Sequence, residues 1–396
     1  MRTFPQCFRP NGSPKEMPPR VMMADVARQA GVHITTVSLA LRNHPSLPLV
    51  TRERIQSLAR QMGYQPDPAL QALIAYRRRA LPHKSQPPLA YVTHWDTEWG
   101  WRNSPAHAEF FAGASARAQD FGYRLEHFWL GAPRLSHRRM SDILFSRGIT
   151  GLIIASHRSE YGQALEFDWP RFSAVKIDFC PSQPELHNVT NDQRAVSQLA
   201  MQRVMSAGYR RIGFIVARWW DDFVDLACSA GFLAVQQRLA AADRIPILFF
   251  PLRLPVKVSL PPADGFLVPR EIFEPWFRRY RPEVLISYGP FVRPLLTEMG
   301  IAIPRDVAYV ETFLGKPDGR TAGIRQNCGR VGELAVEILA SQLQQHIYGV
   351  PAFPTTTLVE GTWFDGKSLP LRRARPSRQP AHPAAAGGTP SRRAAP

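Results

Sequence analysis

Most side chains of residues 33–39 are spaced to face outward from one short helix, and their types suit contact with base edges. The segment before them repeats apolar residues at the spacing of an amphipathic helix, and Gly31 permits a tight turn into the second helix. In that second helix Val37, Ala40 and Leu41 repeat the inward spacing. The pattern predicts a helix-turn-helix whose outer face enters a DNA major groove. The residues expected on that face are His33, Ile34, Thr35, Thr36, Ser38 and Leu39.

Two helices joined at a glycine are also a common packing unit, so this pair alone leaves DNA binding open. A third amphipathic helix follows, with Thr51 placed as its N-cap and Gly63 as the residue after its end. Three short helices of this kind form one compact headpiece, which favours the DNA-binding interpretation. Arg42, Asn43 and Thr51 are the residues that we expect at DNA phosphates.

Short motifs follow one another in order along this region. They are Asp25-Val26-Ala27, Ala30-Gly31-Val32, Thr36-Val37-Ser38, Thr51-Arg52 and Gly63-Tyr64-Gln65-Pro66. With them, residues 21–79 resemble the DNA-binding headpiece and hinge of the lactose-repressor (LacI) family of bacterial transcription regulators. The resemblance implies a hinge helix that forms on operator DNA and inserts Leu73 into the minor groove. The alternative is that Leu73 only packs the hinge onto the core.

Three positions of the headpiece depart from the family pattern. Met22 and His33 stand where the first two helices usually have a hydroxyl cap, so both caps are expected to be weak. Leu39 stands where the resemblance implies a guanine-reading arginine, which removes a paired contact worth about 1–3 kcal/mol of base discrimination. We therefore expect an operator richer in thymine methyl contacts.

The positive charge lies at the ends of the chain. The formal net charge is +17, yet residues 20–80 hold nine Lys or Arg against three Asp or Glu, and residues 372–396 hold six Arg and no acidic residue. This layout fits a polyanionic partner, namely double-stranded DNA with a near-palindromic operator. The alternative is that arginine-rich segments only solubilise the protein, which fits the tail better than the headpiece.

Composition argues against several other classes of protein. The four cysteines are scattered without a CxxC pair, so neither a zinc site nor a disulfide framework is indicated. No apolar run approaches the roughly 18 residues of a membrane span, and no signal-peptide core follows Met1. We expect a cytoplasmic, nucleoid-associated protein with no membrane partner.

The expected division of the chain has six parts. They are a disordered extension (1–20), the headpiece (21–65), a hinge helix (66–79), a linker (80–88), a core that binds an effector and forms a homodimer (89–369), and a disordered basic tail (370–396).

Within the core, short apolar strands alternate with helices, which predicts an α/β core of two parallel-sheet subdomains. Strands are expected at 89–92, 151–154, 174–177, 212–215, 265–268, 284–286 and 307–310, and helices at 106–121, 192–207, 226–242, 291–299 and 329–347. Motifs such as Gly208-Tyr209-Arg210-Arg211-Ile212-Gly213 and Ile324-Arg325-Gln326-Asn327 resemble the family's type I periplasmic-binding-protein-like core. The full fold class is then a small all-α headpiece plus this core, with a cleft beyond the strand ends.

Five residues are candidates for a small-molecule effector of unknown identity. Asp192 and Gln326 match family ligand positions, and Trp95, Arg218 and Trp219 follow strand ends. Asp192 has a competing interpretation as a helix N-cap. Cys228 occupies the place of a sugar-gripping arginine, and Gly289 or Pro290 the place of an aspartate, which argues against an ordinary sugar.

Enzyme chemistry has little support in the sequence. Gly361-Thr362-Trp363-Phe364-Asp365-Gly366-Lys367-Ser368 satisfies the phosphate-loop pattern, but Leu369-Pro370 follows where a helix would be needed. No HExxH, GxSxG or paired-cysteine motif occurs, so we expect no catalytic or metal site and no cofactor. The sequence predicts a ligand-controlled transcription regulator, with repression favoured. The alternatives are a ligand-independent DNA-binding dimer and a nucleotide-hydrolysing enzyme.

Overall fold

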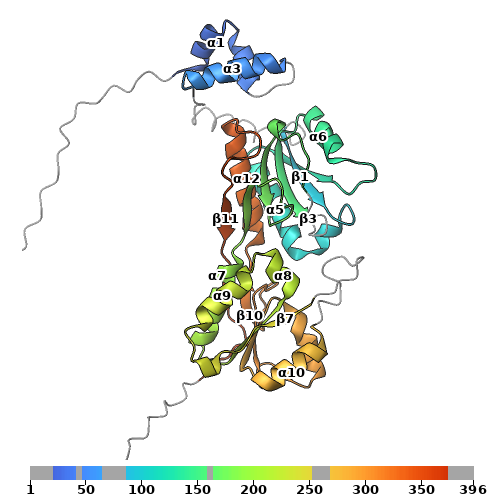
Figure 1. Cartoon of the computed structure of the whole chain (residues 1–396), viewed down its shortest axis with the longest axis vertical. Helices are drawn as coiled ribbons and strands as arrows, with labels where there is room; N and C mark the ends of the chain where they lie inside the picture. The colour runs from blue at the N-terminus through green and yellow to red at the C-terminus, as the bar shows by residue number, and fades with distance from the viewer. Residues whose placement is uncertain (1–20, 42–46, 65–85, 158–163, 252–267, 373–396) are drawn as a thin grey trace, which may run out of the picture.

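The computed structural model of the chain describes residues 21–41, 47–64, 86–157, 164–251 and 268–372. The expectations for the N-terminal extension, the hinge helix, the basic tail after Arg372, and for Arg42, Asn43 and Leu73 lie outside these residues. Two folded parts are described, a helical headpiece and a larger α/β core (Figure 1).

The headpiece consists of α1 (Met23–Ala30), α2 (Ile34–Leu41) and α3 (Leu49–Gln61). Its core is the expected inward set, with Val26, Val37 and Ile55 fully buried. The backbone of Gly31 is left-handed (φ 66°), as the tight turn requires. The prediction of Thr51 as an N-cap was wrong: α3 begins at Leu49, and the carbonyl of Pro48 already accepts the amide of Arg52.

The core contains two sheets, each with six described strands. The order of the first sheet is β11-β5-β4-β3-β1-β2, and that of the second is β12-β10-β9-β8-β6-β7. All the pairings among the described strands are parallel except that of β12 with β10. The first sheet comprises β1 (Pro88–His94), β2 (Arg124–Trp129), β3 (Gly151–His157), β4 (Ser173–Ile177), β5 (His187–Asn191) and β11 (Thr356–Val359). The second comprises β6 (Ile212–Ala217), β7 (Leu248–Phe250), β8 (Val284–Ser287), β9 (Ala308–Glu311), β10 (Ala322–Arg325) and β12 (Thr362–Phe364).

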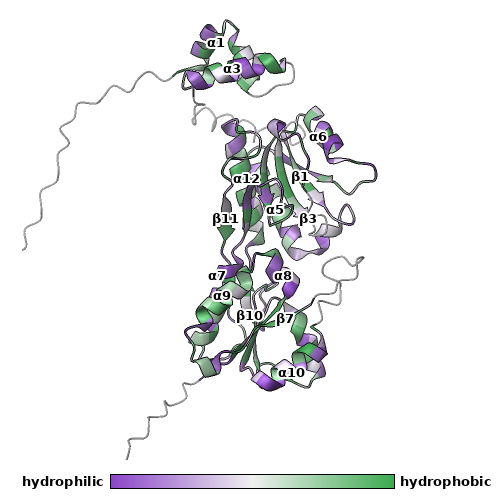
Figure 2. Cartoon of the chain, in the orientation of Figure 1, coloured by the Kyte–Doolittle hydropathy of each residue, from purple (hydrophilic) through white to green (hydrophobic). Residues whose placement is uncertain are grey.

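Helices cover both sheets, and the apolar strands run inside them. In Figure 2 the strands β1 and β3 are largely green, whereas purple gathers on outer helices such as α10. The first subdomain carries α5 (Pro105–Asp120), α6 (His137–Ser146) and α12 (Cys328–Gln344), with short turns η2 (Gly100–Asn103) and η4 (Trp169–Arg171). The second carries α7 (Gln193–Ser206), α8 (Arg218–Phe223), α9 (Ala227–Gln236), α10 (Arg270–Tyr280) and α11 (Arg293–Glu298), with η5 (Ala241–Asp243) and η6 (Pro290–Val292).

The predicted α/β class of the core is confirmed, and six of the seven expected strands lie within or overlap β1, β3, β4, β6, β8 and β9. The expected strand at 265–268 falls almost wholly outside the described residues. Its last residue, Val268, is in no strand and packs into the core just before α10. The helix expected over 226–242 ends at Gln236, and a separate short turn, η5, follows.

Two glycines of α12 differ in how closely the backbone of α5 approaches them. A Cβ at Gly332 would overlap the carbonyl of Phe110 and lie 2.7 Å from the amide nitrogen of Ala114. A Cβ at Gly329 meets only the carbonyl of Glu109, at 4.0 Å. Contact between the two helices therefore requires glycine at position 332 but not at 329.

We expect Gly332→Ala to destabilise the core by about 1–3 kcal/mol, because the added methyl forces the two backbones apart. The matched Gly329→Ala variant should be neutral or slightly stabilising, since alanine favours a helix and has room. Thermal unfolding of both variants checks this. Equal melting temperatures would show that α5 and α12 do not pack as closely as described.

Candidate functional site

The outward face of α2 has the exposure that base contact needs. His33, Ile34 and Thr35 are exposed, and Leu39 is half-buried beside them. Thr36 and Ser38 are half-buried as well. In the described residues this face therefore presents the apolar side chains of Ile34 and Leu39 among the polar side chains of His33, Thr35, Thr36 and Ser38.

Neither α1 nor α2 begins with a hydroxyl cap, and the Met22 side chain makes no capping hydrogen bond, as the sequence predicted. The carboxylate of Asp25 accepts the amide of Met22 at 2.9 Å. The Nδ1 atom of His33 accepts the amide of Thr35 at 3.3 Å and lies 2.8 Å from the Thr35 hydroxyl. The imidazole of His33 thus caps the reading helix in place of a hydroxyl through one long hydrogen bond, which agrees with the weak cap that the sequence predicted.

Side chains of α3 fix the other two helices at their carboxyl ends. The Arg54 guanidinium donates to the carbonyl of Ala30 from both terminal nitrogens, at 3.3 Å each. Gln56 Nε2 donates to the carbonyl of Ala40 at 2.8 Å. Because the last carbonyls of a helix have no partner inside the helix, these bonds hold α2 in a fixed orientation.

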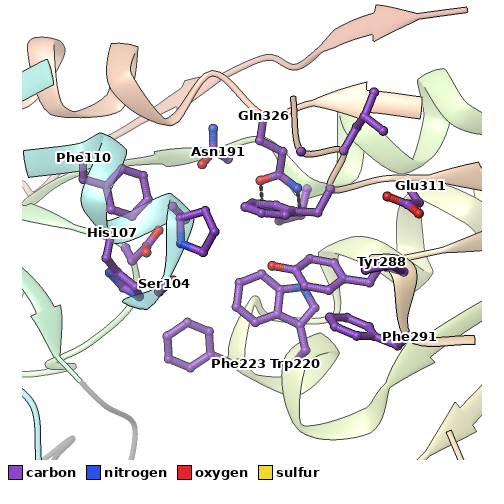
Figure 3. A pocket seen from close by; sticks show the side chains of 18 of the residues that line it. Ser104, His107, Phe110, Asn191, Trp220, Phe223, Tyr288, Phe291, Glu311 and Gln326 are labelled. Carbon is purple, nitrogen blue, oxygen red and sulfur yellow. Dashed lines mark hydrogen bonds between the residues drawn. The ribbon is translucent and has the colours of Figure 1, made fainter. Parts of the chain in front are cut away.

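A cavity of about 600 Å³ lies between the two subdomains of the core, where strands of both sheets end. Figure 3 shows side chains from both sides facing one another, with His107 and Phe110 opposite Trp220 and Tyr288. This volume is in the range of small-molecule sites. Its position agrees with the predicted cleft beyond the strand ends.

Three of the five candidate effector residues line this cavity. They are Trp95, Trp219 and Gln326. Asp192 is not among the lining residues, because its carboxylate caps α7 by accepting the amide of Ala195 at 2.8 Å. Arg218 is also absent from the lining. It is exposed, and its guanidinium lies 3.4 Å from the ring centre of Phe249.

Two buried amides join the segments that form the back of the cavity. Gln193 Nε2 donates to Gln326 Oε1 at 2.9 Å, and Gln326 Nε2 donates to Gln193 Oε1 at 3.0 Å. Asn191, at the end of β5, is buried beside them, and its Nδ2 has no acceptor among the described residues. A buried amide donor without an acceptor marks a place where a ligand or water completes the bonding.

Aromatic side chains form much of the remaining lining, and most of them were not predicted. The rings of Trp220 and Tyr288 are 4.7 Å apart, and Tyr288 stacks with Phe313 at 5.6 Å. Tyr288 directly follows β8 and Asp178 directly follows β4. The rule that parallel strands end at a shared edge could therefore have identified both residues from the sequence.

Two carboxyl groups in the cavity are perturbed by burial. Burial raises the pKa of Glu311 to about 7, while Arg293, 3.7 Å away, opposes the shift. Burial likewise raises the pKa of Asp178 to about 6, against the hydrogen bond from Thr190 and the charge of Lys176. Carboxyl groups perturbed in this way, together in one cavity, favour a binding site.

One residue, at the position where the resemblance implies a sugar-binding arginine, packs among apolar side chains instead. Cys228 is buried in the core of the second subdomain and is not among the cavity-lining residues. Pro290 does line the cavity, at the position where the resemblance implies an aspartate.

The described part of the chain has no helix with the length and apolar character that a membrane span requires. Within the same residues, no three His, Cys, Asp or Glu side chains are grouped as a metal site. Residues 361–368 include β12, which pairs antiparallel with β10, and no helix follows them within the described residues. The phosphate-loop pattern therefore lacks its structural context.

Comparison with known proteins identifies relatives for both parts of the chain. Residues 22–67 match the family model described as bacterial regulatory proteins, lacI family. An HTH-type transcriptional regulator of Mycolicibacterium smegmatis is 24% identical over 207 residues, or 52% of this chain and 54% of that protein. The HTH-type transcriptional repressor CytR of Escherichia coli K12 is 24% identical over 193 residues, or 49% of this chain and 52% of CytR. The chain spans about half the length of these curated relatives, which are regulators rather than enzymes.

Solved structures confirm the fold class. A LacI-family transcriptional regulator protein from Rhizobium etli matches 72% of this chain and 99% of that structure, with a TM-score of 0.54 and 16% identity. The transcriptional regulator CelR in complex with cellobiose matches 88% of this chain and 100% of that structure, with a TM-score of 0.50 and 15% identity.

The buried carboxyl group of Glu311 makes stability depend on pH. Its folded pKa, about 7, lies above the ordinary value of 4.5, so its contribution is fully present below pH 4.5 and is lost as pH rises through 7. We expect Glu311→Gln to stabilise the protein by roughly 1–3 kcal/mol at pH 8, with no gain at pH 4.

Urea unfolding at the two pH values measures this difference. The control is Glu274→Gln, where hydrogen bonding from Arg270 and the nearby Arg278 lower the pKa of a surface carboxyl group that is partly covered, so no gain at pH 8 is expected. A Glu311→Gln protein less stable than wild type at pH 8 would show that the pair with Arg293 outweighs the cost of burial.

Proposed function

We propose that this chain, a member of the LacI family of bacterial regulatory proteins, is a transcription regulator that binds operator DNA and responds to a small ligand in its core cavity. The observation that carries the proposal is the combination, in one chain, of an exposed reading face on α2 and a cavity between two subdomains. We further propose that it acts as a repressor in the cytoplasm, at the chromosome.

The headpiece supports the DNA-binding half of the proposal. His33, Ile34 and Thr35 lie on the exposed face of a helix that α3 holds in place. Thr51, in the first turn of α3, is proposed as a phosphate contact together with Arg42 and Asn43. One headpiece reads only a few base pairs, so a homodimer on a near-palindromic operator is the proposed assembly.

The cavity supports ligand control. Its lining comes from both sheets, so a molecule bound there contacts both subdomains at once. CelR, whose structure shares this fold, was solved with cellobiose. The second candidate function, a DNA-binding dimer without a ligand, is favoured by Cys228, which stands where the resemblance implies a ligand-gripping arginine and is buried in the core.

Selection from a random pool of duplex DNA with the full-length chain tests the DNA-binding function. We expect enrichment of a sequence with two related half-sites, bound by a dimer. Recovery of unrelated sequences, or binding of a single half-site by a monomer, would contradict the proposal.

Leu39 is an apolar residue on the reading face, where the resemblance implies an arginine, and this leads to a specific prediction. We expect Leu39→Arg to change the selected half-site toward guanine, because arginine can donate two hydrogen bonds to guanine O6 and N7, a contact worth about 1–3 kcal/mol. Repeating the selection with the variant measures this. The matched control is Leu49→Arg, which adds the same charge at an exposed position of α3 and should raise general affinity without changing the half-site. Identical half-sites for wild type and Leu39→Arg would mean that Leu39 does not face the bases.

A further inference from the structure

One wall of the cavity is a continuous group of aromatic rings. Tyr288 lies at its centre, 4.7 Å from the ring of Trp220, 5.6 Å from Phe313 and 6.1 Å from Phe291. Trp220 also stacks with Phe223 at 5.6 Å. Figure 3 shows the labelled members of this group turned toward the same space. The electron-rich faces of such rings bind flat apolar groups and attract cations.

The first subdomain contributes strained residues at two neighbouring strand ends. Ser156, at the end of β3, has φ 55°, and Asp178, directly after β4, has φ 66°. Both line the cavity. Left-handed backbone is costly outside glycine, and such residues cluster at binding sites, where surrounding structure holds them in place. The fold thus directs a hydroxyl and a carboxylate to this space at an energetic cost.

The carboxylate of Asp178 is engaged by a hydroxyl rather than by a cation. Its Oδ1 accepts a hydrogen bond from the Thr190 hydroxyl at 2.8 Å. Asp178 takes part in no ion pair among the described residues. The nearby Lys176 ammonium donates instead to the carbonyls of Phe179 and Pro181, at 3.4 and 3.0 Å. A negative charge at the cavity wall therefore has no ammonium or guanidinium group bonded to it.

His157 adds a second acceptor to the same wall. Its Nδ1 lies 3.0 Å from the carbonyl of Ala155, which can only accept, so Nδ1 carries the proton and Nε2 is an acceptor. Nε2 is buried and has no partner among the described residues. Burial lowers the pKa of this imidazole to about 3, so it stays neutral.

The two cationic side chains that line the cavity either bond to protein groups or are exposed to solvent. Arg293 donates to the Thr321 hydroxyl at 2.7 Å and lies 3.7 Å from Glu311, and Lys316 is exposed. Two buried donors of the lining have no acceptor among the described residues, namely Asn191 Nδ2 and the indole nitrogen of Trp220. The inner surface thus offers the acceptors Asp178 and His157, these two donors and aromatic faces, which suit a ligand that carries positive charge and hydrogen-bonding groups.

We propose that the cavity binds an organic cation: an aromatic body lying against Trp220 and Tyr288, with a protonated nitrogen that donates to the carboxylate of Asp178. This inference rests on the proposed function, since it names the ligand class of the same site. A hydroxyl or carbonyl group on the ligand would accept from Asn191.

Titration calorimetry of the full-length chain with matched probes tests the charge preference. Tyramine carries the amine, tyrosol replaces that amine with a hydroxyl, and 4-hydroxyphenylacetate replaces it with an anion. We expect tyramine to bind at least tenfold more tightly than tyrosol, and 4-hydroxyphenylacetate to bind most weakly. Equal binding of tyramine and tyrosol, preference for the anion or for cellobiose, or no binding of tyramine would overturn the proposal.

Two variants locate the charge. Asp178→Asn keeps an acceptor for Thr190 and should remove the preference for tyramine over tyrosol. Asp192→Asn removes the same charge from a residue that only caps α7, and should keep the preference. Preference retained in Asp178→Asn would overturn the assignment to Asp178; if that variant does not fold, the wild-type ranking decides alone. Selective DNA binding by the ligand-free chain is measured separately, so a failed ligand class is distinguishable from a failed regulator function.

Discussion

The chain crosses between the two sheets three times, and the rest of the core depends on these crossings. Within the described residues, the chain passes from the first sheet to the second after β5, returns after β10, and crosses again after β11. The first two crossings meet in the reciprocal hydrogen bonds between Gln193 and Gln326. Neither subdomain is a continuous segment, so the ends of both sheets must face a shared space.

That shared space explains why polar and strained groups gather there. Parallel strands end together, and the residue after each strand is free of the ladder and can direct its side chain into the gap. Asp178 and Tyr288 occupy such positions, after β4 and β8. Burial of an ionised carboxyl group is unfavourable, and it raises the pKa of Glu311 for this reason. The packed apolar clusters of the two subdomains supply the stability that offsets this cost.

The sequence predicted those features that are periodic or carried by motifs. The three headpiece helices, the longest apolar strands and the α/β class follow from spacing alone. Elements with interrupted patterns were missed: α10 contains Pro275, β5 is polar over His187–Asn191, and β7 has only three residues. Of the cavity, Gln326 was found by motif, but aromatic residues such as Phe313 were not. Their role depends on which strand ends meet in space, and the spacing along one strand carries no such information.

A ligand can shift the arrangement of two subdomains only by the difference in its affinity for the two arrangements. The aromatic rings near Tyr288 belong to the second subdomain, whereas Asp178 belongs to the first. A molecule that contacts both the rings and the carboxylate therefore binds best at one separation of the two sheets. A molecule that contacts the rings alone binds almost equally well at any separation. In the proposed regulator, the charged group of the ligand is thus the part that transmits binding to the crossings at Gln193 and Gln326, and the aromatic body mainly sets affinity.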